Sequence, residues 1–435
     1  MYMTKLSLIA DYVTDKISSN DISLYEYVTT DCILQNKKGR EIATNLPPQP
    51  CSLTHYQRGD VLIANIRPYL KKVWFADIDG GASSDVLVFR AKEGHSPSFL
   101  YAVLLQDSFF DYVMQGAKGS KMPRGDKEQI LRYEMPTLSC SEESIGTFFL
   151  NLDYKIRLNE QINQNLEAMA KQLYDYWFVQ FDFPNEEGKP YKSNGGTMVW
   201  NEKLKREIPE KWYSDNICLI VDILSGGTPS KQINEYWDCG CIPFFGPTDY
   251  DGSMFQLHTA DKITESGLQH CSSPLFKENT VIITARGSIG KSVIVGTPMA
   301  MNQSCYALKT KTGEYEYLYF LTAQLIDNLK AKGSGSVFKS IIASDIENTV
   351  LCIANEKVIT LFCDKISPIM KQIKKNTQEI VLLFKQRDEL LPLLMNGQVS
   401  VNSDLAVPYI IIIIGTKYQN YERKHHSGDS REDAT

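Results

Sequence analysis

The feature that most constrains the fold of this 435-residue chain is an internal repeat. The segments GDVLIANIRPYLKKVWFA (59–76) and NTVIITARGSIGKSVIVG (279–296) share one pattern. Each begins with an apolar, strand-like run, continues through an arginine (Arg67 or Arg286) and a short turn with a lysine, and ends in a second apolar run. Self-similarity at a fixed spacing is the signature of a duplicated structural unit. We therefore expect each half of the chain to contain the same kind of domain.

Further matches follow in the same order in both halves. The segment AKGSKMPRGD (117–126) corresponds in position to KGSGSVFKS (332–340). A long helix-like stretch comes next in each half, and Lys155 of the first stretch matches Lys365 of the second. The offset is 219 residues between the two arginines and 210 residues between the two lysines, so a whole unit is repeated with small insertions. We expect each unit to be a mixed domain of about 150 residues followed by a long helix.

Apolar residues recur at heptad spacing in both long stretches. The first stretch carries Leu152, Leu166 and Leu173 with Asn159 in one series and Ile162 with Met169 in another, and the second carries Ile366, Ile373 and Ile380 in one series and Ile369, Leu383 and Leu390 with Asn376 in another. This spacing predicts a coiled-coil seam in which the polar positions fix the register. We expect the two helices to pair with each other. An amphipathic helix that packs on its own domain is the alternative.

Composition excludes several other classes of protein. The chain is 43% hydrophobic and 23% charged, which is typical of a soluble globular protein. Its formal net charge of −6 argues against coating nucleic acid by bulk attraction, but local basic loops remain compatible with DNA reading. The ten cysteines form no C-x-x-C pair and no signal-like leader opens the chain, so we expect a cytoplasmic protein without a metal site. The run Ile410–Ile414 is far shorter than the roughly 20 residues of a membrane span.

The repeat also bears on a second pattern, at residues 285–292. Here ARGSIGKS differs at one residue, Ala285 in place of glycine, from the phosphate loop G-x-x-x-x-G-K-[ST] of nucleotide hydrolases. A phosphate loop needs a helix after it, whereas the SVIVG that follows Lys291 is strand-like. The corresponding RPYLKK of the first half has no glycine. We therefore expect a turn between two strands, with a P-loop nucleotide hydrolase as the alternative, and no catalytic, cofactor-binding or metal-binding residues in this chain.

Basic and small polar residues gather on turns at matched positions of the two halves. Arginine and lysine can fork onto guanine edges, and glycine and serine let the backbone approach a phosphate. The segment LSGGTPSK (224–231) adds another such loop. The residues that we expect to contact DNA are Arg67, Tyr69, Lys71, Lys118, Ser120, Lys121 and Arg124 in the first half, and Thr228, Ser230, Lys231, Arg286, Ser288, Lys291, Ser336 and Lys339 in the second.

Taken together, these segments resemble a known family, the specificity subunits of Type I restriction–modification systems. The likeness is carried by the repeat segments and by YVTTDCILQNKKG (27–39), GSKMPRGDKEQI (119–130), LNEQINQNLEAMAKQLYDYWFVQFDF (158–183) and RDELLPLLMNGQV (387–399). It spans about residues 20–402. The tail from about Ser403 departs from the family, and Cys239 to Cys241 stand where glycines are more usual.

The resemblance implies an α+β fold, with two duplicated α/β target-recognition domains separated by two long helices that form an antiparallel coiled coil. The implied boundaries are 1–150 for the first recognition domain, 151–196 for the first helical region and linker, 197–355 for the second recognition domain, 356–402 for the second helical region, and 403–435 for a tail that we expect to be disordered.

The resemblance also implies a role. The chain would be a non-catalytic subunit that recognises an asymmetric, two-part target in double-stranded DNA. It would direct two methyltransferase subunits and the restriction/translocase subunits to that target. S-adenosylmethionine, ATP and Mg²⁺ would belong to those partners, and none of them to this chain. A coiled-coil scaffold without DNA specificity is the other alternative.

Overall fold

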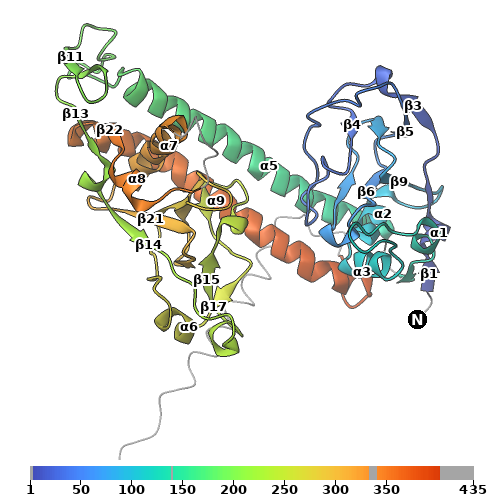
Figure 1. Ribbon diagram of the computed structural model, residues 1–435. Helices are drawn as coiled ribbons and strands as arrows, with labels where there is room; N and C mark the ends of the chain where they lie inside the picture. Colours follow the sequence, from blue (N-terminus) through green and yellow to red (C-terminus); the bar gives the residue numbers. More distant parts are fainter. Residues whose placement is uncertain (1–2, 139–140, 333–339, 402–435) are drawn as a thin grey trace, which may run out of the picture. The chain divides into compact units, whose positions relative to one another are not determined.

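The computed structural model describes residues 3–138, 141–332 and 340–401 of the chain (Figure 1). The tail predicted at 403–435 lies outside the described residues. The described residues divide into two compact units: those up to 155 and those from 383 on form the first, and those between 156 and 382 form the second. Both units contain helices and strands, as the predicted mixed α and β fold requires.

The first unit is built around two four-stranded sheets. One sheet is antiparallel and has the order β2 (Ala10–Tyr12), β9 (Val86–Ala91), β6 (Val61–Ala64) and β7 (Val73–Phe75). The other has the order β3 (Lys16–Ser18), β5 (Ser52–Tyr56), β8 (Gly80–Ala82) and β4 (Tyr27–Val28). The continuous apolar run VLIA of β6 is buried along its whole length, which is typical of a strand inside a core. A separate pair joins β1 (Met3–Lys5) to β10 (Glu134–Pro136).

Four short helices complete this unit: α1 (Leu6–Ile9), α2 (Pro97–Leu104), α3 (Asp107–Gln115) and α4 (Lys127–Ile130). Local sequence explains where α2 begins. The Ser96 hydroxyl accepts the N–H of Phe99, and Pro97 occupies the first turn, where its missing N–H has no helical partner to lose. Every residue of α2 from Ser98 to Leu104 is buried, so this apolar helix fills the core.

The second unit contains a five-stranded sheet of order β14 (Val221–Ser225), β21 (Cys305–Thr310), β18 (Val281–Thr284), β19 (Ser292–Val295) and β16 (Phe255–Gln256). A three-stranded sheet has the order β17 (Lys262–Ile263), β15 (Ile242–Phe245) and β20 (Ala300–Met301). Two strand pairs join β11 (Met198–Asn201) to β12 (Arg206–Pro209) and β13 (Tyr213–Asn216) to β22 (Val350–Ile353). The shorter helices are α6 (Glu265–Gln269), α7 (Tyr315–Lys332) and α8 (Ala343–Glu347).

The two units share a strand order. The order β2-β9-β6-β7 of the first unit corresponds to β14-β21-β18-β19 of the second, with antiparallel pairing throughout. Within the repeat, Val61 faces Phe75 in the first unit and Val281 faces Ile294 in the second. Each unit also pairs an early strand with a late one, β1 with β10 and β13 with β22. The repeat in the sequence is therefore accompanied by a repeat in the topology.

Two long helices account for the heptad stretches. Helix α5 runs over Glu142–Tyr174 and α9 over Glu356–Met395, with 33 and 40 residues. The start of α9 coincides with the predicted boundary at residue 356. The predicted boundary between residues 150 and 151 falls inside α5, because the helix begins at Glu142, before its first heptad residue.

Buried amides join the two helices within the second unit. The Asn376 amide donates to Asn163 Oδ1 at 2.9 Å, and the Asn163 amide donates to the Thr377 hydroxyl at 3.2 Å. The Asn159 amide donates to Glu379 Oε2 at 2.9 Å. Because residue numbers rise along α5 as their partners' numbers fall along α9, the two segments run antiparallel.

The buried face of α5 differs in part from the predicted one. Ile162 and Met169 are 37% and 56% exposed, so the prediction that they form the second heptad series is wrong. The side chains that alternate with Leu152, Asn159, Leu166 and Leu173 are instead Ile156, Asn163 and Ala170, all buried. Asn163 is polar and Ala170 is small, so the spacing of large apolar residues did not indicate that this series is buried. It indicated Ile162 and Met169 instead.

An aromatic cluster ends α5 in the second unit. A π-helical turn, Asp175–Val179, follows the helix and places Trp177 and Phe178 in the core. The Phe178 ring lies 4.9 Å from that of Phe362 on α9 and 5.7 Å from that of Trp212. Wide π turns are commonly found at functional or packing adjustments of a helix. Here the turn lets one helix end bury successive aromatic residues.

The paired amides generate a prediction about stability. Replacing Asn163 by Leu leaves the Asn376 amide without its acceptor, and the free energy of unfolding in urea should fall by about 1–3 kcal/mol. The double variant Asn163→Leu/Asn376→Leu removes both partners and should recover most of that loss. Gln161→Leu, at an exposed position of the same helix, is the control and should change little. A double variant no more stable than the single one would contradict the pairing.

Candidate nucleic-acid interface

The turn that carries Arg286 lies between two antiparallel strands. β18 pairs with β19 so that Val281 faces Ile294, and a strand rather than a helix follows Lys291. The prediction of a strand–turn–strand unit is confirmed. The phosphate-loop alternative is wrong, because no helix N-terminus follows the turn to hold a phosphate.

One buried hydroxyl organises this turn. The Thr284 hydroxyl, in a side chain that is 1% exposed, donates to the carbonyl of Ser288 at 2.5 Å and accepts the N–H of Lys291 at 3.0 Å. Gly287 and Gly290 have φ values of +77° and +71°, a conformation that favours glycine. The frame of the turn thus depends on one threonine and two glycines, and it leaves the other side chains to project.

The predicted contact residues Arg286, Ser288 and Lys291 are exposed on this frame. The Lys291 Nζ lies 5.6 Å from the ring of Tyr250. Arg286 has no ion-pair partner within the described ranges. A guanidinium that is not committed inside the protein is available for a base edge or a phosphate.

The loop 226–231 lies beside this turn, because both are bonded to the segment that precedes β21. The carbonyl of Ser304 accepts the backbone N–H of Arg286 at 3.2 Å. The Thr228 hydroxyl donates to Gln303 Oε1 at 2.5 Å in the same segment. The structure therefore brings two of the predicted loops of the second unit together.

Ser230 and Lys231 close that loop against Trp237. The indole N–H of Trp237 donates to the carbonyl of Ser230 at 3.0 Å. Lys231 Nζ lies 5.3 Å from the indole ring and 3.7 Å from Asp261. The Lys231 side chain is 71% exposed, so its weak ion pair leaves the ammonium accessible to an incoming anion.

Arg67 and Tyr69 occupy the corresponding turn of the first unit, between β6 and β7. Arg67 precedes a 3₁₀ turn, Pro68–Leu70, with a φ of +54°. Both side chains are exposed, Tyr69 at 49%. The N–H of Arg67 donates to the carbonyl of Pro123 at 2.8 Å. This bond places the turn against the loop of residues 118–124.

That loop is a narrow hairpin. Lys118 and Arg124 exchange two backbone hydrogen bonds of 2.9 Å each. Ser120 and Lys121 lie between them and are exposed. Lys121 has no ion pair in the part of the chain that the structure describes. The turn with Arg67 and Tyr69 and the hairpin with Ser120 and Lys121 are thus neighbouring loops.

Three other basic residues of the first unit are paired with carboxylates: Lys118 with Asp126 at 2.8 Å, Arg124 with Asp85 at 3.2 Å and Lys71 with Asp107 at 2.9 Å. The side chains of Lys118 and Arg124 are 81% and 57% exposed, and such exposed pairs contribute only about 0–1 kcal/mol. A phosphate can replace their carboxylates at little cost. Lys71 is 31% exposed and holds the turn to helix α3, so it is the predicted contact least available to DNA.

Ser336 and Lys339 lie outside the described residues. The chain that follows them returns to the basic turn, since the N–H of Ile341 donates to the carbonyl of Ala285 at 2.9 Å. In the first unit, the N–H of Gly125 likewise donates to the carbonyl of Asn65, at 3.4 Å.

Two residues of the second-unit surface were missed by the sequence analysis. Tyr250 lies beside Lys291, and Gln303 holds Thr228. Neither is basic nor part of the repeat segments, so the search for basic turns passed over them. The only local signal is that Tyr250 follows the turn sequence Gly-Pro-Thr-Asp at 246–249.

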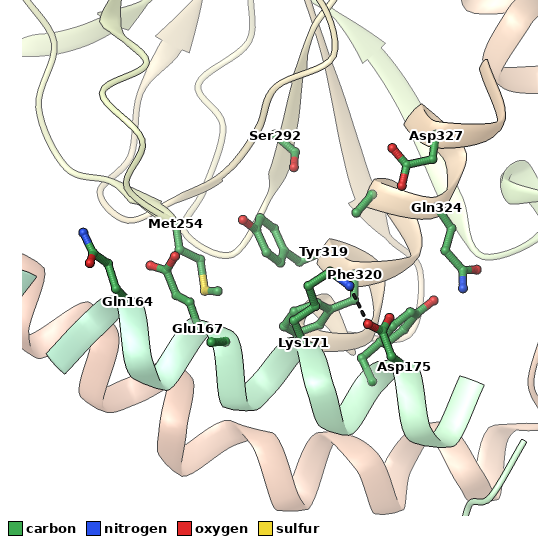
Figure 2. A pocket seen from close by; sticks show the side chains of 13 residues that line it. Gln164, Glu167, Lys171, Asp175, Met254, Ser292, Tyr319, Phe320, Gln324 and Asp327 are labelled. Atoms are coloured by element: carbon green, nitrogen blue, oxygen red, sulfur yellow. Dashed lines mark hydrogen bonds and ion pairs between the residues drawn. The ribbon is translucent and has the colours of Figure 1, made fainter. Parts of the chain in front are cut away.

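A cavity of about 390 Å³ lies between α5 and α7 in the second unit (Figure 2). Glu167 and Lys171 of α5, Tyr319 and Asp327 of α7, and Ser292 at the start of β19 contribute to its walls. Lys171 forms an ion pair with Asp175 one turn further along the chain.

Within the described residues, no cluster of three or more metal-ligating side chains occurs in this cavity or elsewhere. Likewise, the described helices include none with the length and apolarity to span a membrane.

Glu167 is a carboxyl group of this cavity whose pKa is shifted by its surroundings. Burial raises its pKa to about 7, although the N–H of Met254 donates to it and opposes the shift. The carboxyl is therefore held where it takes up a proton near neutral pH.

Comparisons with known proteins agree with the fold. Residues 209–381 match the family model of the Type I restriction modification DNA specificity domain. The Type I restriction enzyme MjaIX specificity subunit of Methanocaldococcus jannaschii is 25% identical over 396 residues, covering 88% of this chain and 86% of its own length. The HindI specificity subunit of Haemophilus influenzae is 22% identical over 435 residues, covering 86% of this chain and 94% of its own length.

A solved structure supports the same assignment at the level of the fold. The Type I restriction–modification S subunit from M. genitalium superposes with a TM-score of 0.56, at 13% identity, over 92% of this chain and 96% of that one. Residues 209–381 of the second unit thus match a DNA specificity domain of the Type I class. Over most of its length the chain is similar to specificity subunits of Type I restriction–modification systems.

The raised pKa of Glu167 gives a pH-dependent prediction. The folded-state pKa of about 7 exceeds the ordinary value of 4.5, so the folded state binds the proton more tightly and Glu167 lowers stability as pH rises from 4.5 to 7. Glu167→Gln should raise the free energy of unfolding by about 2 kcal/mol at pH 8 and by much less at pH 5. Glu207→Gln, at an exposed position on β12, is the control. An equal gain for Glu167→Gln at both pH values would contradict the buried-carboxylate explanation.

Proposed function

We propose that this chain recognises an asymmetric, two-part sequence in double-stranded DNA and carries partner subunits to it. The observation that supports the proposal best is that two units of the same strand order each expose a basic turn at the same place in the sheet. In one unit the turn reads Arg-Pro-Tyr from Arg67, and in the other it reads Arg-Gly-Ser from Arg286. Different side chains on a common frame read different bases, so the two half-sites should differ.

The shared strand order supports interpreting the two units as duplicated target-recognition domains. The hydrogen bonds between α5 and α9 support an antiparallel coiled coil in which Asn159, Asn163 and Asn376 fix the register. Such a coiled coil acts as a ruler. A helix of 33 residues is about 50 Å long, somewhat more than the roughly 34 Å of one turn of duplex.

The relatives suggest the partners. We infer that two methyltransferase subunits and the restriction/translocase subunits assemble on this chain in the cytoplasm. S-adenosylmethionine, ATP and Mg²⁺ would serve those subunits, while this chain contributes recognition and no catalysis. With a net charge of −6, the chain would depend on its partners for much of the neutralisation of the DNA backbone.

Removing the guanidinium of Arg286 tests the reading of bases. In the assembled methyltransferase complex, Arg286→Ala should weaken binding to the cognate duplex by about 1–3 kcal/mol and reduce discrimination at one base position. Lys203→Ala is the matched control, because it removes one positive charge from an exposed position on the β11–β12 turn. Competition binding against cognate and scrambled duplexes measures both effects. Unchanged discrimination in Arg286→Ala would remove this residue from the interface.

Shortening both helices tests the ruler. Deleting 159–165 from α5 together with the facing 373–379 from α9 removes one heptad from each helix, takes out the register amides together with their partners, and leaves the remaining heptads in phase. The helices become shorter by about 10 Å, which corresponds to about three base pairs. Methylation mapping should then find the same half-sites with a shorter spacer, or no methylated site. Co-purification with the methyltransferase subunits verifies folding, and an unchanged spacer in a folded complex would refute the ruler.

A further inference from the structure

Unusual backbone conformations gather at one place in the first unit. Among the described residues, eight that are not glycine have positive φ values, and four of them are Asn36, Lys37, Arg67 and Lys71, with φ between +51° and +61°. Residues with side chains rarely adopt this left-handed conformation, and they keep it only where the surroundings impose it. The basic turn that carries Arg67 is therefore held by something outside its own sequence.

The backbone of a second turn supplies part of that restraint. The N–H of Asn36 donates to the carbonyl of Leu70, and the N–H of Lys37 donates to the carbonyl of Lys71, both at 2.9 Å. These two bonds dock the 36–37 turn onto the end of the basic turn. The four left-handed residues thus belong to two segments that are hydrogen-bonded to each other.

One carboxylate joins the same two segments through their side chains. Asp107 Oδ1, at the start of α3, lies 2.8 Å from Lys37 Nζ and 2.9 Å from Lys71 Nζ. Burial by itself would raise the pKa of Asp107, but the hydrogen bonds from Lys37 and Lys71 hold that pKa below its ordinary value. The Lys37 side chain is 5% exposed and the Asp107 side chain 55%, so the lysine end of this bridge is buried while the carboxylate end meets solvent.

The last part of α9 continues the network. The Arg387 side chain is 2% exposed, and its Nη1 donates to the carbonyl of Lys37 at 3.1 Å and to Asp153 Oδ1 at 3.3 Å. Its Nη2 lies 3.0 Å from Asp388, whose carboxylate is 3.7 Å from Lys37 Nζ. Hydrogen bonds and ion pairs therefore run without interruption from α9 through Lys37 and Asp107 to the basic turn.

Among the described residues of the second unit, aromatic side chains lie at the matching position. The offset of 210 residues between the two long helices relates Arg387 to Trp177 and Asp153 to Cys363. There, Trp177 packs against Phe362 with ring centroids 5.8 Å apart. The two units therefore make different kinds of contact at matching positions of their long helices, charged in the first and aromatic in the second.

We propose that Lys37, Asp107 and Arg387 are positioning residues for recognition of the first half-site. They hold the turn that presents Arg67 and Tyr69 at a fixed place relative to the end of α9. A turn that is ordered before binding loses less conformational entropy when it meets DNA, and it presents its guanidinium in one direction. The inference rests on the proposed function, because it takes the basic turn to be a reader of DNA.

The test measures each half-site separately in the assembled methyltransferase complex. Three duplexes are compared: the cognate one, one with the first half-site scrambled and one with the second half-site scrambled. Asp107→Asn keeps the size of the side chain and removes its charge. It should reduce the preference for an intact first half-site about tenfold and leave the preference for the second half-site unchanged. Asp107→Glu should restore much of the preference.

Controls separate the possible failures. Asp111→Asn changes an exposed carboxylate one turn further along α3 and should have no effect on either preference. Arg67→Ala removes the reader itself. If Arg67→Ala leaves the first half-site preference intact, the proposed function of this turn fails. If Arg67→Ala abolishes that preference and Asp107→Asn does not change it, only the positioning role fails. An equal loss at both half-sites in Asp107→Asn would show a general structural defect and would also overturn the proposal.

A second variant addresses Lys71, which we also predicted as a direct contact. If Lys71 acts through Asp107, Lys71→Gln should cause no further loss of the first half-site preference in the Asp107→Asn background. Additive losses would show that Lys71 contacts DNA independently of the carboxylate, and they would overturn the link from Asp107 to the turn. If Asp107→Asn does not fold, Lys37→Gln gives the measurement, because Lys37 is not a predicted DNA contact and its replacement should lower the first half-site preference only through the turn.

Discussion

A pair of buried side-chain amides, Asn163 and Asn376, determines how the two long helices meet within the second unit. A slip of one heptad would place each amide against an aliphatic neighbour and leave its hydrogen bonds unmade, which costs far more than the bond itself contributes. The polar contact is therefore less a source of stability than a selector of register. The aromatic end of α5 reaches Phe362 only because this register is kept.

The two units show how one topology tolerates different chemistry. The sheets share a strand order. The helical segments of the first unit are held by a buried arginine and several carboxylates, whereas those of the second are held by edge-to-face aromatic rings. Buried ions are costly to desolvate and are seldom the most stable solution. Their presence near the basic turn of the first unit agrees with a role in fixing geometry, while the second unit fixes its turn locally through Thr284.

Much of this fold could be predicted because its strands and helices follow from hydrophobic patterns between residues that are close in the sequence. The apolar runs on either side of Arg286 already favoured a strand pair over a phosphate loop, and the heptads indicated paired helices. The partner of Asn376 could not be predicted, because Asn163 is polar and a search for large apolar residues ignores it. The bond between Lys71 and Asp107 was also missed, since it joins segments that are distant in sequence. In both cases the contact that could not be predicted is a polar contact between residues that are far apart in the sequence.

The turn between β18 and β19 has one more consequence. Its frame consists of strand pairing, the Thr284 hydroxyl and two glycines, and none of these involves the side chains of Arg286, Ser288 or Lys291. Those positions can change identity without disturbing the fold that displays them. A surface built in this way can acquire a new preference through single substitutions. A change in the DNA sequence that such a chain prefers therefore does not require a new fold. Substitutions of exposed side chains on an unchanged turn are sufficient.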